Sequence, residues 1–197
     1  MKPNDPNDLF RIKTEHTPPA QGCLLLSEPF LIDASFGRSA VLLIDHNAEG
    51  SMGIVLNKPL PVLANDVVNE FKYLEDIPIY SGGPMADEYL FFIHTLPQIP
   101  DALPLGRGLY FNGDFNEIKR YILQGNPIEG RIRFFLGYSG WAPGQLQQEI
   151  EEDTWIVTAP TPNLIMHSDN NLWQKSLSAM GQKYRIWSRY PQIPDMN

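Results

Sequence analysis

Eight short apolar segments, each bounded by glycine, proline or polar residues, limit this chain to a fold built mainly of β-strands. Apolar runs of this length with turn-forming residues at both ends are typical of buried strands. The segments are residues 22–27, 38–45, 51–57, 77–80, 89–95, 108–112, 132–136 and 155–158. Strands of this kind need partners, so we expect them to pair in one sheet.

Four short helices are expected among these strands, because apolar residues recur there at helical spacing. The first follows Pro61, the second starts at Asp114, the third starts near Pro143, and the fourth spans about residues 169–180. The helices interrupt only the later strands, unlike the regular strand-helix alternation of a doubly wound fold. The sequence therefore predicts the α+β class with a mixed sheet.

The chain is expected to form one domain. Of its 197 residues 43% are hydrophobic and only 19% are charged, which suffices for one core and excludes a disordered chain. Residues 1–21 are polar and contain four prolines, so we expect a flexible N-terminal arm there. The single domain is then predicted to span residues 22–197.

Charge and composition limit the classes of partner that this protein is expected to bind. The net charge of −8 repels polyanions, so direct binding to duplex DNA is not expected. Cations alternate with aromatic residues over 183–190, which fits a terminal edge strand or, alternatively, a surface for single-stranded nucleic acid. Cys23 is the only cysteine, and the sequence shows no signal peptide and no membrane span. These features predict a cytoplasmic protein without a disulfide.

No sequence motif indicates a cofactor or a metal. The turn at residues 81–84 is rich in glycine but lacks the lysine of a P-loop, and Gly106 and Gly108 open no helix of a dinucleotide fold. His46, His94 and His167 are far apart in the sequence, and no pair has the spacing of metal ligands on one helix face. We therefore predict neither a cofactor nor a metal site.

Residues 131–153 read as a strand, a tight turn at 137–141 and a helix. The turn suggests a nucleophile elbow around Ser139, but that motif needs a second glycine where Trp141 stands. The start of the following helix could instead hold an anion. The helix ends in four acidic residues, Glu149, Glu151, Glu152 and Asp153, which are either simply solvated or face a basic partner.

Several blocks of the sequence resemble, in order, those of the AlgH/YqgE family of bacterial proteins, some of which are labelled transcriptional regulators. The matching blocks are residues 36–46, 50–60, 82–84, 92–95, 136–141, 144–150 and 155–160. The resemblance implies an α+β domain with a branched sheet curled into a pseudo-barrel. It implies no active-site residues.

We predict a non-enzymatic, cytoplasmic regulatory or binding protein that contacts another protein or a small anionic ligand, because motif residues gather at strand ends and turns. The alternative is a hydrolase-like enzyme that uses the 137–141 turn, with Ser139 assisted by His46 or His94. The candidate binding surface consists of Arg38, His46, Asn57, Gly82, Gly83, Tyr138, Trp141, Gln145 and Glu149.

Overall fold

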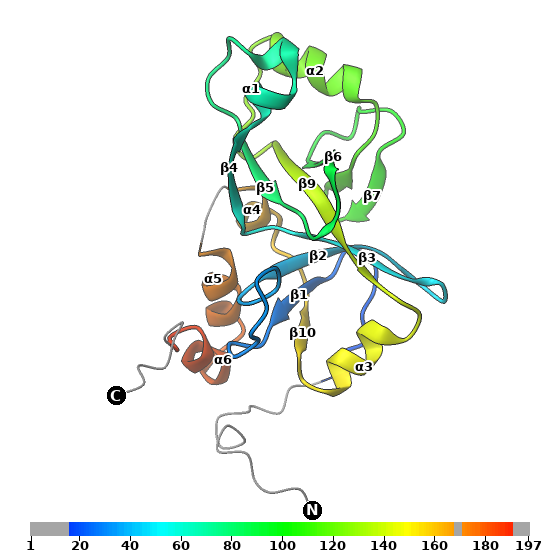
Figure 1. Cartoon of the computed structure of the whole chain (residues 1–197), viewed down its shortest axis with the longest axis vertical. Helices are drawn as coiled ribbons and strands as arrows, with labels where there is room; N and C mark the ends of the chain where they lie inside the picture. Colours follow the sequence, from blue (N-terminus) through cyan, green and yellow to red (C-terminus); the bar gives the residue numbers. More distant parts are fainter. Residues whose placement is uncertain (1–15, 168–170, 191–197) are drawn as a thin grey trace, which may run out of the picture.

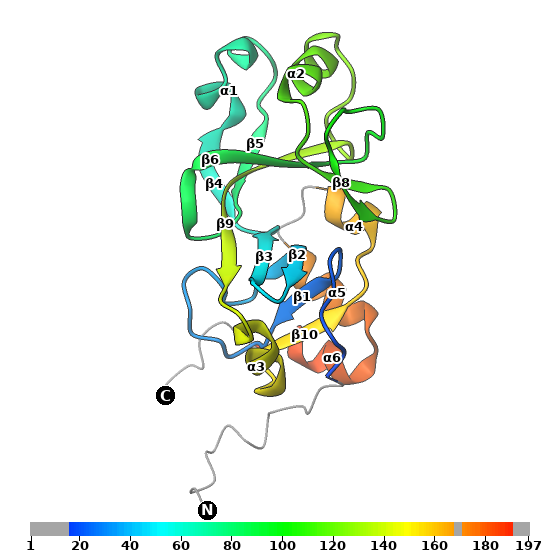
Figure 2. The same cartoon turned by 90° about the vertical axis from the view of Figure 1, so that its right-hand side faces the viewer.

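The computed structural model describes residues 16–167 and 171–190, and the predicted flexible arm lies largely outside the described residues. Its ten described strands form one sheet that is not closed, with the order β10-β1-β2-β3-β9-β6-β8-β7 and with β4 and β5 branching from β9 (Figures 1 and 2). The strands are β1 (Leu24–Ser27), β2 (Ala40–Asn47), β3 (Gly50–Val55), β4 (Pro59–Leu63), β5 (Pro78–Ser81), β6 (Met85–His94), β7 (Leu103–Gly106), β8 (Leu109–Phe111), β9 (Ile132–Trp141) and β10 (Trp155–Thr158).

Strand β9 is the branch point of the sheet. It pairs with the parallel strand β5 and the antiparallel strand β6 through the same residues, 134–136, so these two strands lie on opposite edges of β9. Its last residues pair with β3, where Ser51 lies opposite Trp141. The predicted α+β fold with a mixed, branched sheet is thus confirmed, and the curled sheet stays open.

The described helices are short, and none has the length and apolarity that crossing a membrane requires. Helix α2 begins after Asp114, whose carboxylate accepts a hydrogen bond from the Asn116 amide at 2.8 Å, as the capping pattern indicates. The helices are α1 (Ala64–Val67), the 3₁₀ turn η2 (Asn69–Phe71), α2 (Phe115–Leu123), α3 (Gln145–Glu151), α4 (Pro162–Met166), α5 (Leu172–Ala179) and α6 (Gln182–Trp187).

Two predictions of local structure outside the 131–153 segment differ from the structure. The helix expected after Pro61 forms only in part: Pro59–Leu63 is strand β4, which pairs with β5, and the helical residues that follow are divided into the single turn α1 and the 3₁₀ turn η2. The expected terminal edge strand is helix α6, in which Trp187 is buried and packs edge-on against Tyr184. The alternative of a nucleic-acid surface needed alternating outward aromatic side chains, and the helix removes that alternation.

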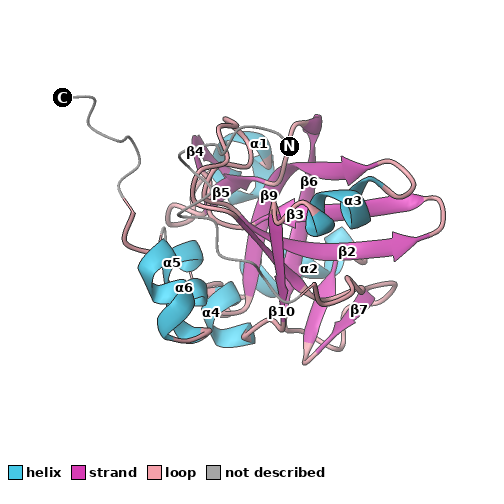
Figure 3. Ribbon diagram, turned by 90° about the horizontal axis from the view of Figure 1, so that it is seen from below, coloured by secondary structure: helices cyan, strands magenta, loops and turns pink. Residues whose placement is uncertain are grey.

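The lower part of the sheet is buried on both faces. Alternate residues of β1 enter different cores: Leu24 and Leu26 face one, and Leu25 faces the other. Helices α4, α5 and α6 cover the first face and contribute Trp173 and Trp187, as Figures 1 and 3 show. Helix α3 covers the second with Leu146. Burial on both faces explains why these strands read as continuous apolar runs.

A third core fills the upper part of the molecule, where α1 and α2 pack on β4, β5, β6 and the first half of β9 (Figure 2). Phe71, Ile118 and Phe134 are fully buried there. Strand β9 runs from this upper core to the lower sheet, so its end lies at the junction of the two parts. The β2–β3 hairpin meets it at that junction.

Candidate functional site

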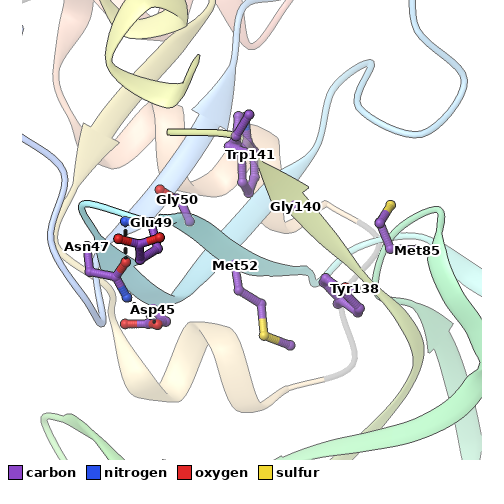
Figure 4. Close-up of a pocket in the computed structure, with 11 residues that line it drawn as sticks. Asp45, Asn47, Glu49, Gly50, Met52, Met85, Tyr138, Gly140 and Trp141 are labelled. Atoms are coloured by element: carbon purple, nitrogen blue, oxygen red, sulfur yellow. Dashed lines mark hydrogen bonds between the residues drawn. The ribbon is translucent and has the colours of Figure 1, made fainter. Parts of the chain in front are cut away.

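A pocket of about 400 Å³ opens where the tip of the β2–β3 hairpin meets the end of β9. Figure 4 shows the carboxylates of Asp45 and Glu49 at the hairpin end, Tyr138 and Met85 toward the other end, and Met52 between them. We call it the hairpin pocket. It is lined by Asp45, Asn47, Glu49, Gly50, Ser51, Met52, Met85, Tyr138, Gly140, Trp141 and Ala142.

The hairpin geometry places Asp45 and Glu49 in the lining of the same pocket. A register shift between Leu43 and Asp45 ends the buried part of β2, so that Asp45 is exposed. The Asn47 side chain then donates to the Asp45 carboxylate at 2.9 Å and accepts from the Glu49 amide at 2.8 Å. Gly50 has a φ of 135°, and a Cβ there would lie 2.4 Å from the Trp141 carbonyl oxygen. The hairpin can therefore touch β9 only with glycine at this position.

The hairpin pocket carries uncompensated negative charge. Its lining contains no lysine, arginine or histidine. Within the part of the chain that the structure describes, Asp45 and Glu49 form no salt bridge. No described group of three or more His, Cys, Asp and Glu residues could hold a metal ion. The pocket therefore combines acidic groups with polarisable apolar walls.

A second pocket, of about 420 Å³, shares Gly140 and Trp141 with the hairpin pocket. We call it the tryptophan pocket. It is lined by Leu31, Asp33, Phe36, Gly140, Trp141, Gln145, Glu149, Glu152, Thr154 and Trp155. The rings of Phe36, Trp141 and Trp155 lie 5.7 to 6.2 Å apart between centroids. Aromatic faces and carboxylates thus meet in this pocket as well.

Glu149 holds the tryptophan pocket together. Its Oε2 accepts hydrogen bonds from the indole N–H groups of both Trp141 and Trp155 at 2.8 Å, and its Oε1 accepts from the Gln145 amide at 2.9 Å. The same Gln145 accepts from the Ala142 amide, so this donor at the helix start is already engaged. Glu149 is therefore a structural carboxylate that orients two tryptophans.

The other acidic residues at the end of α3 also have partners. Glu151 and Glu152 accept from the glutamines four residues earlier, Gln147 and Gln148, at 2.9 Å. Asp153 lies 3.1 Å from the His16 imidazole. Carboxylates at the C-terminal end of a helix meet the negative end of its dipole, and these local hydrogen bonds offset part of that repulsion.

The nine residues of the predicted binding surface fall into separate groups. Tyr138 and Trp141 line the hairpin pocket, whereas Gln145 and Glu149 line the tryptophan pocket together with Trp141. His46 lies between two lining residues, and its Nδ1 is hydrogen-bonded to Ser51 Oγ at 2.7 Å. These five residues are close together around the end of β9.

Arg38 and Asn57 lie in neither of these two pockets. The Arg38 guanidinium donates to the Tyr190 carbonyl and lies 5.3 Å from the centre of the Trp173 ring, and burial lowers its pKa. Asn57 is buried, donates to the Arg38 carbonyl and accepts from the Ala40 amide, both at 2.9 Å. Both side chains therefore have a structural role, because their hydrogen bonds hold backbone segments together.

Gly82 and Gly83 are buried directly after β5, where the chain lies close against β9. A Cβ on Gly82 would lie 2.2 Å from the Gly137 carbonyl oxygen, and one on Gly83 would lie 2.3 Å from the Tyr138 carbonyl oxygen. Contacts this short exclude any side chain. The two glycines therefore permit a close backbone crossing.

The predicted turn at residues 137–141 is wrong, because these residues belong to strand β9, which is irregular at Gly137, where φ is 73°, but continues to Trp141. Ser139 is fully buried in this strand, and its hydroxyl donates to the Gly82 carbonyl at 3.2 Å. A nucleophile elbow needs an exposed serine on a sharp turn. The geometry required for the hydrolase-like alternative is absent here.

His94 is also unsuited to assist Ser139, because both its ring nitrogens are engaged elsewhere. The Leu96 amide donates to Nδ1 at 3.2 Å, so Nε2 carries the proton and donates to the Asn112 carbonyl at 2.8 Å. Burial lowers the pKa of His94, although the backbone bonds to Asn112 and Leu96 partly oppose this effect. The neutral His94 ring therefore has a structural role, because it links the backbone at Leu96 to the backbone at Asn112.

The lowered pKa of His94 predicts a pH-dependent stability. Below the ordinary histidine pKa of about 6.5, the unfolded chain binds a proton that the folded ring resists, so folding loses stability by up to about 1.4 kcal/mol per pH unit. The free energy of unfolding keeps falling until the pH reaches the pKa of His94 in the folded protein, which is the lower of the two. Urea titrations from pH 8 to pH 5 should show this slope in the wild type and a smaller one in His94→Gln. Equal slopes in the two proteins, or an effect as large in His46→Gln, would contradict the assignment.

Comparison with known proteins gives a consistent result. The family model described as AlgH-like matches residues 24–185. A UPF0301 protein of Bacteroides fragilis is 54% identical over 191 residues, covering 96% of this chain and 97% of the relative. One of Bacteroides thetaiotaomicron is 53% identical over 195 residues, covering 98% of this chain and 100% of the relative.

Two solved structures are similar in fold. A Corynebacterium diphtheriae protein has a TM-score of 0.76 at 24% identity, covering 90% of this chain and 95% of that one. The AlgH protein of Pseudomonas aeruginosa has a TM-score of 0.69 at 24% identity, covering 91% of this chain and 98% of that one. At this identity the two comparisons support the fold alone.

Proposed function

This chain belongs to the AlgH-like family, as its sequence motifs predict, and we propose that it is a cytoplasmic, non-enzymatic binding protein whose hairpin pocket receives a basic side chain of a protein partner. The observation that carries the proposal is the pair of unneutralised carboxylates, Asp45 and Glu49, facing a wall of thioether and aromatic groups. A regulatory role would follow from capture of that partner.

Charge favours a cation over an anion in this pocket. Two carboxylates at its rim would repel a small anionic ligand, which is the other partner class expected from the sequence. An arginine guanidinium can instead form charge-assisted hydrogen bonds with both carboxylates. The overall charge of −8 would also steer a basic segment toward the surface.

The other walls favour a protein segment over an isolated cation. Met52 and Tyr138 are partly buried, and Met85 is 48% exposed, so an apolar neighbour of the basic residue could cover them. Methionine side chains adapt to differently shaped ligands and are common at binding surfaces. The volume of about 400 Å³ lies within the usual range for binding pockets.

Two further observations agree with a non-enzymatic, cytoplasmic protein. Ser139 is buried without a histidine partner, so it offers no activated nucleophile. Cys23 is a free thiol, and burial raises its pKa, which disfavours the reactive thiolate. A free, unreactive cysteine suits a reducing compartment.

The test uses short peptides with one basic residue. We expect acetylated Ala-Leu-Arg-Leu-Ala to bind the wild type, and the double variant Asp45→Asn/Glu49→Gln to bind it roughly tenfold more weakly, since two charge-assisted contacts are lost. Fluorescence polarisation of a labelled peptide measures the affinity. The matched control is Glu75→Gln/Asp76→Asn, which removes the same charge from a surface that does not line the hairpin pocket.

The control separates local recognition from general attraction. Equal weakening in the two double variants would mean that only the net charge of the protein matters. Absence of binding, or equal binding of Ala-Leu-Glu-Leu-Ala, would overturn the proposal.

A further inference from the structure

A third pocket, of about 250 Å³, lies between helices α4 and α5, where β1 begins and β10 ends. We call it the helical pocket. It reaches the lower core, because Leu24 and Ile165 are only 2% and 1% exposed. Ala159, Thr161 and Ala179 are exposed, so the pocket opens to solvent on that side. It is lined by Leu24, Thr158, Ala159, Thr161, Leu164, Ile165, Ser176, Ala179 and Met180.

The lining of the helical pocket is uncharged. It contains no ionisable side chain, in contrast to the hairpin pocket with its two carboxylates. Apart from the hydroxyl groups of Thr158, Thr161 and Ser176, its side chains are apolar. A charged ligand would lose its hydration there without gaining a partner of opposite charge. The helical pocket therefore favours a neutral ligand.

Ser176 brings a buried polar group without a partner to this lining. The residue is 6% exposed, and its Oγ has no hydrogen-bond partner in the part of the chain that the structure describes. Such groups are rare in folded proteins, because a buried hydroxyl that forms no hydrogen bond is unfavourable. A serine hydroxyl can turn among its staggered rotamers, so a polar atom of a ligand in the pocket can supply the missing partner.

The size and the apolar lining of the helical pocket indicate an organic ligand. A volume of about 250 Å³ holds roughly eight water-sized groups of about 30 Å³ each. Each ordered water needs about three hydrogen bonds, which a mainly apolar lining does not favour. A ligand with an apolar body could instead cover Leu24, Ile165 and Met180, while one polar atom satisfies Ser176.

We infer that the helical pocket binds a neutral, mainly aliphatic molecule of about that size, whose hydroxyl or carbonyl oxygen forms a hydrogen bond with Ser176 Oγ. No residue lines both this pocket and the hairpin pocket. The inference therefore does not depend on the proposed function, and the two sites can be tested separately.

The probe for the helical pocket is 1-hexanol, and the reporter is the methyl group of Met180. In protein with ¹³C-labelled methionine methyl groups, we expect 1-hexanol to shift the Met180 signal until it saturates. The Met52 and Met85 signals, which report on the hairpin pocket, should keep their positions. Hexanoate and hexylammonium have the same chain length but carry a charge, so they should bind roughly tenfold or more weakly.

Two serines of α5 provide matched variants. Ser176 lines the helical pocket, whereas Ser178 does not and is hydrogen-bonded to Ser188 Oγ at 3.1 Å. Ser176→Ala should weaken the binding of 1-hexanol roughly two- to tenfold, which is the usual contribution of one hydrogen bond. Ser178→Ala should leave it nearly unchanged.

The same variants test, without ligand, whether Ser176 lacks a partner within the protein. Ser176→Ala should unfold at the same urea concentration as the wild type or at a higher one, because it removes a buried hydroxyl that forms no hydrogen bond. The inference would be overturned by a Met180 signal that 1-hexanol does not shift, or by equal binding of the charged analogues. Equal affinities of the two serine variants, or a clear fall of the urea midpoint in Ser176→Ala, would also overturn it.

Discussion

Replacing Glu149 by alanine should lower the free energy of unfolding by about 2–6 kcal/mol, because two buried indole N–H donors would lose their acceptor at about 1–3 kcal/mol each. Trp141 and Trp155 are only 6% and 2% exposed, so water cannot readily replace the carboxylate. The bonds from both indoles are short, at 2.8 Å, and are made to one charged oxygen. Such bonds are stronger than those between neutral groups.

The matched control for Glu149 is Glu151→Ala in the same helix. Glu151 is exposed and accepts only from Gln147, so its removal should change stability by no more than about 0.5 kcal/mol. Urea unfolding followed by tryptophan fluorescence measures both variants. Similar, small effects from the two substitutions would show that Glu149 does not fix the tryptophans.

Replacing Arg133 by methionine should lower the free energy of unfolding by about 2–6 kcal/mol, because two buried carbonyl groups would lose their donor at about 1–3 kcal/mol each. Arg133 is 4% exposed and donates to the carbonyls of Leu56 and Ile165 at 2.6 Å each. Its guanidinium lies 4.2 Å from the centre of the Tyr80 ring. Methionine fills a similar volume but leaves both buried carbonyls without a donor.

Arg133 binds β9 to two distant segments of the chain, so its loss should loosen the attachment of α4 at Ile165. Burial lowers the pKa of Arg133, yet arginine stays protonated at any pH at which proteins fold, so the effect should not depend on pH between 6 and 8. The control is Arg131→Met, since Arg131 is exposed and forms only a long, 3.4 Å bond with Thr95. Equal free energies of unfolding for the two variants would show that Arg133 does not stabilise the contact between β9 and these two segments.

Local sequence patterns correctly predicted the helices and strands whose structure depends mainly on residues within the element itself. Helix α2 has its capping carboxylate at Asp114 and its buried stripe at Ile118 and Ile122, all within one short stretch. Helix α1 was misjudged because Leu63 and Val67 share helical spacing, whereas β5 recruits Pro59–Leu63 as a strand partner. That pairing depends on residues nearly twenty positions away, which a local pattern does not contain.

The candidate site was only partly predictable for the same reason. Tyr138, Trp141, Gln145 and Glu149 lie near one another in the sequence, and the motif around them pointed to this region. Asp45 and Glu49 were not predicted; the structure places both at the end of the hairpin because only two residues separate β2 from β3. Met85 reaches the pocket only through the pairing of β6 with Tyr138, a contact between distant residues.

The most direct test of the central claim is an NMR titration with Ala-Leu-Arg-Leu-Ala of protein that carries ¹³C-labelled methionine methyl groups. Met52 and Met85 line the hairpin pocket, whereas Met166, the last residue of α4, is 2% exposed in the core. In the wild type we expect the Met52 and Met85 methyl signals to shift until they saturate, and the Met166 signal to keep its position. In Asp45→Asn/Glu49→Gln we expect the shifts of Met52 and Met85 to be lost. Unmoved Met52 and Met85 signals, or equal shifts with the glutamate peptide, would contradict it.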